Sequence, residues 1–222
     1  MKVVVASKYL LAYLELMKTT TTQKQARKAT EIRRQEIVDA GMRILTSEGA
    51  RQFTAERLGA EVGIASGTIF RHFSSMEEIL DAIVDRIEEI IFGGFPPKSD
   101  NPLERLRLFF EARVQAITEH PEVSKLLTTS ILVPNGNNDT REKRLRKFKL
   151  RSQRFVTDCL KQAHAEGLLA EGVLQQESSI LVLGAIYAIG HMGISANDVQ
   201  DQRDLAERIW RVLEKSLSQI NR

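Results

Sequence analysis

Side chains suited to hydrogen bonding with nucleic acid lie close together in one short stretch of the chain, where Ser66, Thr68 and Arg71 surround Gly67. Serine and threonine hydroxyls bond base edges in the major groove of DNA, and an arginine bonds guanine through two parallel contacts. Such readout requires an element that presents these residues together to the groove. The neighbouring sequence must therefore supply a short, exposed helix and a scaffold that holds it.

A short helix is predicted immediately before this stretch. Thr54 is a suitable N-cap, because its hydroxyl can accept a bond from the first turn. Leu58 and Val62 follow on one face, four residues apart. Gly63 then ends the helix, since glycine adopts the left-handed conformation at little cost.

A second short helix is predicted to begin at Ala65 and Ser66, with Ile69 and Phe73 facing inward. Two short helices joined by a tight glycine-containing turn form a helix-turn-helix. In that motif the N-terminal part of the second helix enters the major groove. The same spacing also fits a helical hairpin without DNA, so spacing alone leaves both interpretations open.

The residue string is more specific than the spacing. Residues 67–73 read Gly-Thr-Ile-Phe-Arg-His-Phe and residues 74–80 read Ser-Ser-Met-Glu-Glu-Ile-Leu, which resembles the signature of the TetR family of transcriptional regulators. The resemblance is close over residues 32–80, with Gly59 and Gly63 at the family spacing. Beyond that range only the length and the helix layout are similar.

Three positions depart from the family pattern. Phe70 stands where a tyrosine usually offers its hydroxyl to a phosphate, and Met76 stands where a lysine usually does so. Ala65 occupies a position where serine is common. Two of the phosphate contacts that the family makes are therefore in question for this chain.

The resemblance implies an all-α fold, with an N-terminal three-helix helix-turn-helix DNA-binding domain and a C-terminal helical domain for ligand binding and dimerisation. It implies a repressor that binds a double-stranded DNA operator as a homodimer and is released by a small-molecule effector, although the sequence does not distinguish repression from activation. Base edges would be contacted by Ser66, Thr68 and Arg71, with Gly67 beside them. Thr54, Phe70 and His72 would lie by the DNA backbone.

Charge is distributed unevenly along the 222 residues. Residues 1–74 hold 12 Lys/Arg against 7 Asp/Glu, residues 75–140 hold 6 against 12, and residues 141–169 hold 9 against 3. A positive N-terminal segment suits a surface that faces phosphates. The single cysteine, Cys159, excludes an internal disulfide and suits a reducing cytoplasm.

Residues 1–26 are predicted to be an N-terminal extension followed by a basic arm. Lys8 and Glu15 interrupt the apolar run of residues 1–17, so we expect neither a signal peptide nor a membrane span. Residues 1–16 are interpreted as a dispensable extension, with an amphipathic helix on the body of the protein as the alternative. Lys24, Arg27 and Lys28 belong to the polar segment 18–30, which is predicted to be an arm that either is solvated or reaches DNA.

The remaining chain is predicted to form a DNA-binding domain over residues 27–75 and a second domain over residues 76–222. Ser75 and Glu78 have the spacing of a capping box at the start of the linking helix. Apolar residues recur at helical period, and glycine, proline and N-cap residues divide the predicted helices. These helices cover residues 31–48, 75–91, 101–119, 121–132, 139–166, 175–192 and 204–220.

Residues 141–154 hold eight Lys/Arg in fourteen positions. One interpretation is a second nucleic-acid surface. The alternative is the solvated outer face of a long helix, with the acidic segment 75–140 supplying intramolecular partners, and we favour this alternative.

The second domain offers candidates for an effector cavity and a dimer interface. Large aromatic and isolated polar side chains on its helices are candidates for the cavity: Phe109, Phe110, Arg113, Phe148, Phe155, Tyr187 and His191. The helix over 175–192 is apolar nearly all round, which requires cover on every side. The candidate dimer residues on the last two helices are Leu181, Gly184, Ala185, Ala188, Leu205, Ile209 and Leu213.

Catalytic and metal-binding motifs are absent from the sequence, and the four histidines are scattered. We therefore expect no enzyme activity, no cofactor and no metal. Two other functions stay open. One is a DNA-binding regulator without a ligand, controlled by a protein partner or by its own concentration; the other is an enzyme or carrier that uses the aromatic cavity.

Overall fold

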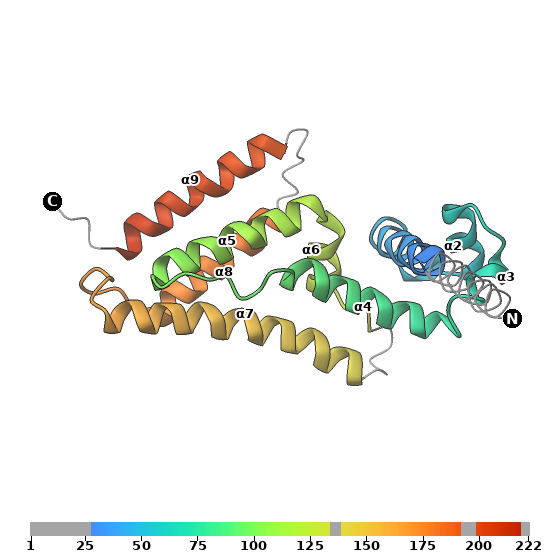
Figure 1. Cartoon of the computed structure of the whole chain (residues 1–222), viewed down its shortest axis with the longest axis horizontal. Helices are drawn as coiled ribbons and strands as arrows, with labels where there is room; N and C mark the ends of the chain where they lie inside the picture. Colours follow the sequence, from blue (N-terminus) through green and yellow to red (C-terminus); the bar gives the residue numbers. More distant parts are fainter. Residues whose placement is uncertain (1–27, 134–138, 192–198, 219–222) are drawn as a thin grey trace, which may run out of the picture.

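The computed structural model describes residues 28–133, 139–191 and 199–218, so the predicted extension and most of the arm lie outside the described residues. Within these ranges the chain is built from helices, apart from an isolated antiparallel bridge between Leu169 and Ser218. The predicted all-α fold is confirmed, with the helix-turn-helix at one end of an elongated molecule (Figure 1).

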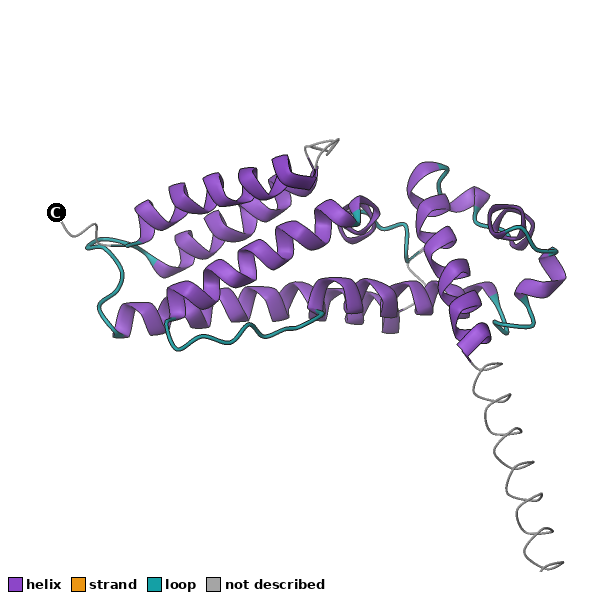
Figure 2. Cartoon of the chain, turned by 45° about the horizontal axis from the view of Figure 1, so that its top comes forward, coloured by secondary structure: helices purple, strands orange, loops and turns teal. Residues whose placement is uncertain are grey.

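Two groups of helices are joined by α4, which extends from one group to the other (Figures 1 and 2). The first group holds a helix over residues 28–47, the 3-10 turn η1 (Ala50–Gln52), α2 (Ala55–Val62) and α3 (Ser66–Ile69). The linking helix α4 covers Met76–Phe92. The second group holds α5 (Pro102–Glu119), α6 (Pro121–Thr128), α7 (Asp139–Ala165), α8 (Gln175–His191) and α9 (Val199–Leu217).

The described boundaries differ from the predictions by four residues or more at three places. The helix predicted over 121–132 ends at Thr128, although Leu132 is still fully buried beyond it. The last helix begins at Val199 rather than at residue 204. The second helix of the motif ends at Ile69, because the amides of Arg71 and His72 bond the carbonyls three residues earlier and so form a tighter turn.

The turn between α2 and α3 has the predicted local chemistry. The Thr54 hydroxyl accepts a hydrogen bond from the Arg57 amide at 3.2 Å, and Gly63 is left-handed with φ 73°. Gly59 allows the chain to pass closely over α2, since a Cβ atom there would lie 2.6 Å from the Ile64 carbonyl oxygen. These three residues determine how the chain turns from α2 into α3.

The N-terminus of α4 is capped in a way that differs from the predicted capping box. The Ser75 hydroxyl accepts the Glu78 amide at 3.1 Å, as expected. The Glu78 carboxylate, however, accepts from the amide of Ser74 at 2.6 Å and from its hydroxyl at 2.8 Å. These bonds, with a further one from Arg34, lower the pKa of Glu78 to about 2, so the carboxylate stays ionised.

Two apolar cores stabilise the molecule. The first is formed by the helix-turn-helix residues and α4, and it continues into the second group through Val123, Leu126, Leu132 and Phe148. The second core lies among α5, α7, α8 and α9. Because α4 and part of the second group share one core with the helix-turn-helix, the two groups of helices are packed together rather than linked by a free segment.

Ion pairs along one side of α4 add a second connection, to α7. Arg141 is 1% exposed and bonds Glu77 at 2.8 Å and Asp81 at 2.9 Å, while its other nitrogen donates to the Leu132 carbonyl at 3.0 Å. Arg144 lies 2.5 Å from Asp85 and 3.5 Å from Glu88, and Arg151 lies 3.7 Å from Glu88. We call these contacts the α4–α7 ladder.

Arg141→Ala should lower the free energy of unfolding by about 2–4 kcal/mol, because it removes a buried side chain and leaves the Leu132 carbonyl without this donor. The matched control is Arg146→Ala on the same helix, whose side chain is 68% exposed and whose ion pair should contribute about 0.5 kcal/mol or less. Urea unfolding followed by circular dichroism measures both. Equal losses in the two variants would contradict the structural role of Arg141.

Gly59→Ala should destabilise the protein by about 2 kcal/mol or more, since the added methyl meets backbone that is unable to move aside cheaply. Gly67→Ala is the control, because a Cβ atom there meets nothing within 4 Å and alanine favours a helix by about 0.5–1 kcal/mol. Thermal unfolding of both variants tests the pair. A Gly59→Ala protein as stable as the wild type would show that the turn is not tightly packed.

Candidate DNA-binding surface, effector cavity and dimer face

The residues predicted to read DNA lie together on the outer surface of α3 and the turn after it. Gly67, Phe70 and Arg71 are exposed, and Ser66 and Thr68 are half-buried at the start of α3. Phe70 is 49% exposed, which is unusual for a large apolar side chain. Arg71 forms no ion pair with any other residue that the structure describes, so its guanidinium remains available for a base edge.

The other two candidate residues take part in the fold. The Thr54 hydroxyl is already engaged as the cap of α2, which leaves its second lone pair and its proton for a phosphate. His72 is half-buried and its carbonyl accepts a hydrogen bond from Arg34. Its Nδ1 atom is buried without a hydrogen-bond partner within the described part of the chain.

Arg34 holds the end of the recognition segment against α4. It donates to the His72 carbonyl, bonds Glu78 at 3.0 Å, and stacks over the Phe73 ring at 3.9 Å. These contacts occupy the Arg34 guanidinium within the fold. A cation near the start of a helix gives no sign of partners that lie 38 and 44 residues away in the sequence.

Positive charge around the helix-turn-helix is weaker than the total for residues 1–74 suggests. Residues 28–74 hold seven Lys/Arg and six Asp/Glu. Arg57 is paired with Glu48 at 2.6 Å and with Glu61 at 3.0 Å. Most of the N-terminal excess therefore lies in the segment before residue 28, where the basic arm was predicted.

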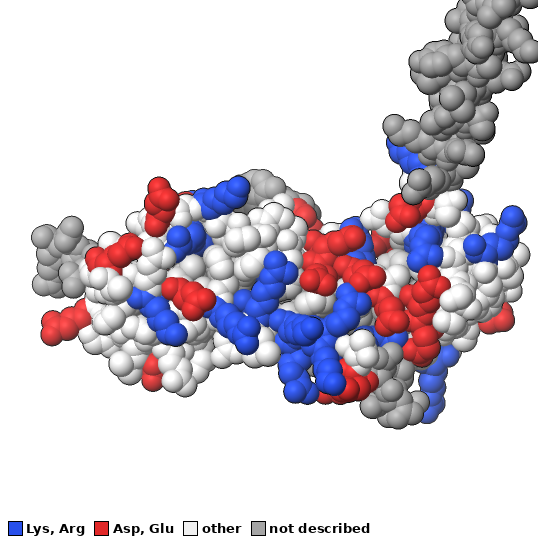
Figure 3. Space-filling model, turned by 60° about the horizontal axis from the view of Figure 1, so that its bottom comes forward, with Lys and Arg blue, Asp and Glu red and all other residues white. Residues whose placement is uncertain are grey.

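The basic run at residues 141–154 lies on α7, and three of its arginines form the α4–α7 ladder. Figure 3 shows the basic and acidic side chains side by side on this face of the molecule. The interpretation that the acidic segment supplies intramolecular partners is confirmed for Arg141, Arg144 and Arg151. Lys147 and Arg154 are exposed and form no ion pair within the described ranges.

A small cavity of about 70 Å³, which we call the inner cavity, lies between α4, α5, α6, α7 and α8. Four of the seven residues predicted for an effector site line it, namely Phe109, Arg113, Phe148 and Tyr187. Ser124 and Ser152 also line it and were missed, because isolated serines carry no sequence signal for a pocket. The lining thus combines aromatic rings with a few polar groups, as small-molecule sites do.

Arg113 is the polar centre of this cavity. It is 6% exposed and donates to the carbonyl of Ile91 in the last turn of α4 and to the Ser152 hydroxyl at 3.4 Å. Its guanidinium stacks on Phe92 at 4.3 Å and on Phe109 at 4.9 Å. Burial, and then the charge of Arg151, lower the pKa of Arg113 to about 10, so it remains cationic at neutral pH.

Three predicted cavity residues lie elsewhere. Phe110 packs against Trp210 in the second core, with ring centroids 5.7 Å apart. Phe155 lies 4.9 Å from Phe95, centroid to centroid, on the wall of a larger open groove. His191 is exposed at the end of α8. Helical periodicity predicts which side chains face inward, but not which cavity or core each of them borders. For this reason all three residues were predicted to line one cavity.

One face of α8 exposes a stripe of apolar and small residues, with Tyr187 of the cavity among them. Ile180 is 63% exposed, Leu181 57% and Tyr187 45%, with Gly184 and Ala188 exposed between and beside them. The spacing of these residues puts them on one helix face. Ala185, Leu205 and Ile209 are half-buried, whereas Leu213 faces the core of its own chain.

Among the described residues, no group of three or more His, Cys, Asp or Glu has the arrangement of a metal site, and Cys159 is a buried free thiol. None of the described helices combines the length and the apolar character needed to cross a membrane.

Comparison with known proteins finds a family match in the N-terminal part of the chain. The family model described as "Bacterial regulatory proteins, tetR family" matches residues 37–83. The nucleoid occlusion factor SlmA of Actinobacillus pleuropneumoniae serotype 5b (strain L20) is 26% identical over 131 residues, covering 57% of this chain and 64% of that protein. The HTH-type transcriptional repressor KstR2 of Mycobacterium tuberculosis (strain ATCC 25618 / H37Rv) is 32% identical over 91 residues, covering 40% and 46%. The chain thus spans less than two thirds of the curated relatives that it matches.

Solved structures extend the likeness to the fold of nearly the whole chain. The ketosteroid transcriptional regulator KstR2 of Mycobacterium tuberculosis superposes with a TM-score of 0.70 at 18% identity, covering 84% of this chain and 95% of that one. AibR, in complex with isovaleryl coenzyme A and operator DNA, superposes with a TM-score of 0.65 at 18% identity, covering 84% and 98%. Residues 37–83 of this chain therefore match the TetR family of bacterial regulatory proteins, and most of the chain has the fold of solved TetR/AcrR regulators.

Proposed function

We propose that this protein is a homodimeric transcriptional repressor that binds an operator through α3 and is released by a small-molecule effector. The observation that carries the proposal is the surface formed by Ser66, Gly67, Thr68 and Arg71. It is held in place by the turn at Gly59 and by Arg34, and it lies in the region that matches the TetR family. A regulator of this kind acts on DNA in the cytoplasm.

DNA binding by this surface would combine base contacts with phosphate contacts from several sources. Arg71 is the residue best placed to bond guanine, because its side chain is exposed and forms no ion pair with described residues. Phe70 offers only apolar contact, so the near-neutral surface of residues 28–74 needs additional cations. The basic arm, with Lys24 and Arg27 outside the described ranges, is the natural source.

The exposed stripe of α8 supports a homodimer. Ile180, Leu181 and Tyr187 form a contiguous apolar face of the kind that marks interaction sites. A twofold pairing places the same stripe of the partner against it. Gly184 and Ala188 on the same face permit the two helices to approach closely.

The effector part of the proposal rests on Arg113, which connects the cavity to the carbonyl of Ile91 at the end of α4. An effector that bonds Arg113 would compete with that carbonyl and alter how α4 is held. Coupling between such sites is typically about 1–3 kcal/mol, or about 5–150-fold in affinity. The structure of AibR with isovaleryl coenzyme A and operator DNA supports an effector for a protein of this fold.

A second candidate is a DNA-binding protein without a small-molecule effector, controlled by a protein partner or by its own concentration. The small size of the inner cavity, about 70 Å³, favours this candidate, because a drug-sized ligand needs about 300 Å³ or more. The match to SlmA, named a nucleoid occlusion factor, shows that this sequence pattern is not confined to proteins named as transcriptional regulators. An effector would therefore have to enlarge the cavity or bind partly outside it.

Operator binding tests the proposal directly. DNA recovered by randomised-site selection should bind as one dimer per duplex in sedimentation experiments, and the affinity should fall steeply with salt. Arg71→Ala should cost about 1–3 kcal/mol of discrimination at one base pair in anisotropy titrations. Lys161→Ala, an exposed cation on α7, is the control and should leave operator preference unchanged. Binding that is equally weak on unrelated DNA, or a single chain per duplex, would contradict the proposal.

A further inference from the structure

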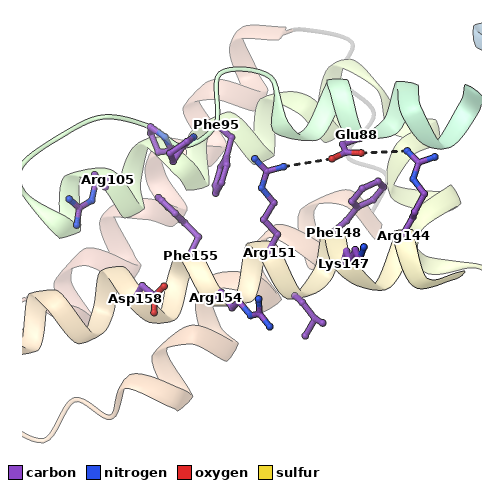
Figure 4. A pocket seen from close by; sticks show the side chains of 13 residues that line it. Glu88, Phe95, Arg105, Arg144, Lys147, Phe148, Arg151, Arg154, Phe155 and Asp158 are labelled. Atoms are coloured by element: carbon purple, nitrogen blue, oxygen red, sulfur yellow. Dashed lines mark ion pairs between the residues drawn. The ribbon is translucent and has the colours of Figure 1, made fainter. Parts of the chain in front are cut away.

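An open groove of about 1190 Å³ lies on the outer side of α7, beside the segment of Phe95, Pro96 and Pro97 that follows α4 (Figure 4). Five cationic side chains line it: Arg105, Arg144, Lys147, Arg151 and Arg154. Glu88 and Asp158 are the acidic residues of the lining. The groove therefore has an excess of positive charge, although it lies in a chain whose net charge is only +3.

The cations are only partly neutralised. Arg144 is paired with Asp85 at 2.5 Å, whereas Glu88 is shared between Arg144 at 3.5 Å and Arg151 at 3.7 Å, distances that are long for ion pairs (Figure 4). Arg105 donates to the Ser99 carbonyl and to the Gln162 side chain, which are neutral acceptors. Lys147 and Arg154 form no ion pair within the described ranges. A ligand with more than one negative charge would satisfy these groups.

The wall of the groove is aromatic. Phe95 and Phe155 are half-buried with ring centroids 4.9 Å apart, and Phe155 lies 5.0 Å from Phe109 of the inner cavity. Phe148 lines both the groove and the inner cavity. The two spaces thus share the Phe148 side chain as part of their walls. A ligand suited to the whole region has an anionic head and a short apolar arm.

We propose that this groove binds the phosphate-bearing head of an amphipathic effector, with the apolar arm packed on Phe95 and Phe155 and directed towards the cavity of Arg113. Phosphate groups fit better than a single carboxylate, because several guanidinium and ammonium groups are spread along α7 and each phosphate accepts two parallel bonds from an arginine. Most of the ligand lies in the groove, so the small inner cavity receives only the end of the arm.

The phosphate-bearing head of the ligand also acts on α4. This step rests on the proposed function, in which an effector controls operator binding. Phosphate oxygens on Arg144 and Arg151 replace the Glu88 carboxylate, while Arg144 keeps its shorter contact with Asp85. This removes two contacts of the α4–α7 ladder near the C-terminal half of α4. The groove borders α4 at Glu88, in the C-terminal half of that helix, whereas α3 precedes its N-terminus. The head therefore affects operator binding through α4 rather than by contact with DNA.

The test uses calorimetry on the full chain with four probes. Hexanoyl-coenzyme A carries a phosphate-rich head and an arm, coenzyme A carries the head alone, hexyl phosphate carries one phosphate with the same arm, and hexanoate carries no phosphate. We expect hexanoyl-coenzyme A to bind most tightly and hexanoate most weakly. If hexyl phosphate binds most tightly instead, the head is that of a simple phosphate ester. Hexanoate binding as well as hexanoyl-coenzyme A, or no binding by any phosphate probe, would overturn the proposal.

Paired variants locate the site. Lys147→Gln/Arg154→Gln removes two charges of the groove and should weaken binding of the best phosphate probe about tenfold or more. Lys143→Gln/Lys161→Gln removes two charges from α7 outside the groove, and its affinity should stay within about twofold of the wild type. Equal affinities of the two variants would overturn the proposal.

Operator binding separates this proposal from the proposed function. Without a probe, the groove variant should bind the selected operator as the wild type does, and loss of binding there would show that the groove serves DNA. With the probe, the wild type should lose operator affinity and the groove variant should keep it. If the protein binds the probe through the groove but binds no operator, the proposed ligand site stands and the proposed function as a DNA-binding regulator is refuted.

Discussion

The burial of Arg141 against the acidic side of α4 is the constraint on which the arrangement of this molecule depends. A guanidinium that is 1% exposed has to be paired, and its partners Glu77 and Asp81 belong to the first two turns of the linking helix. Arg144 and Arg151 continue the same contacts towards the other end of α4. The position of α4, and with it the position of α3, is therefore set from the side by α7.

A linking helix held in this way can transmit a change from one end to the other. At its N-terminal end, Arg34 joins Glu78 of α4 to the turn that follows α3. At its C-terminal end, Arg113 bonds the Ile91 carbonyl and Glu88 meets two arginines of α7. The polar groups at both ends of α4 can exchange their present partners for others. The apolar core between the two ends holds α4 together as one element.

The sequence predicted the local structure well and the long-range contacts poorly. The Thr54 cap, the left-handed Gly63 and the Ser75 cap follow from short-range rules, and the structure has all of them. The partners of Arg34, Arg113 and Arg141 lie far away in the chain, and a single sequence contains no record of them. Phe110, Phe155 and His191 were grouped with the inner cavity because apolar periodicity identifies buried faces but not the space that each face borders.

The distance between α2 and α7 tests most directly whether the α4–α7 ladder positions the helix-turn-helix. Spin labels at Glu56→Cys and Lys161→Cys, in a Cys159→Ala background diluted with unlabelled chain, report that distance by double electron–electron resonance within one chain. We predict a narrow distance distribution for the otherwise unchanged protein. It should broaden or shift in Asp85→Asn/Glu88→Gln, which removes two acids of the ladder. It should stay unchanged in Asp139→Asn/Glu142→Gln, because those two acids pair within α7. Superimposable distributions for the two double variants would contradict the account.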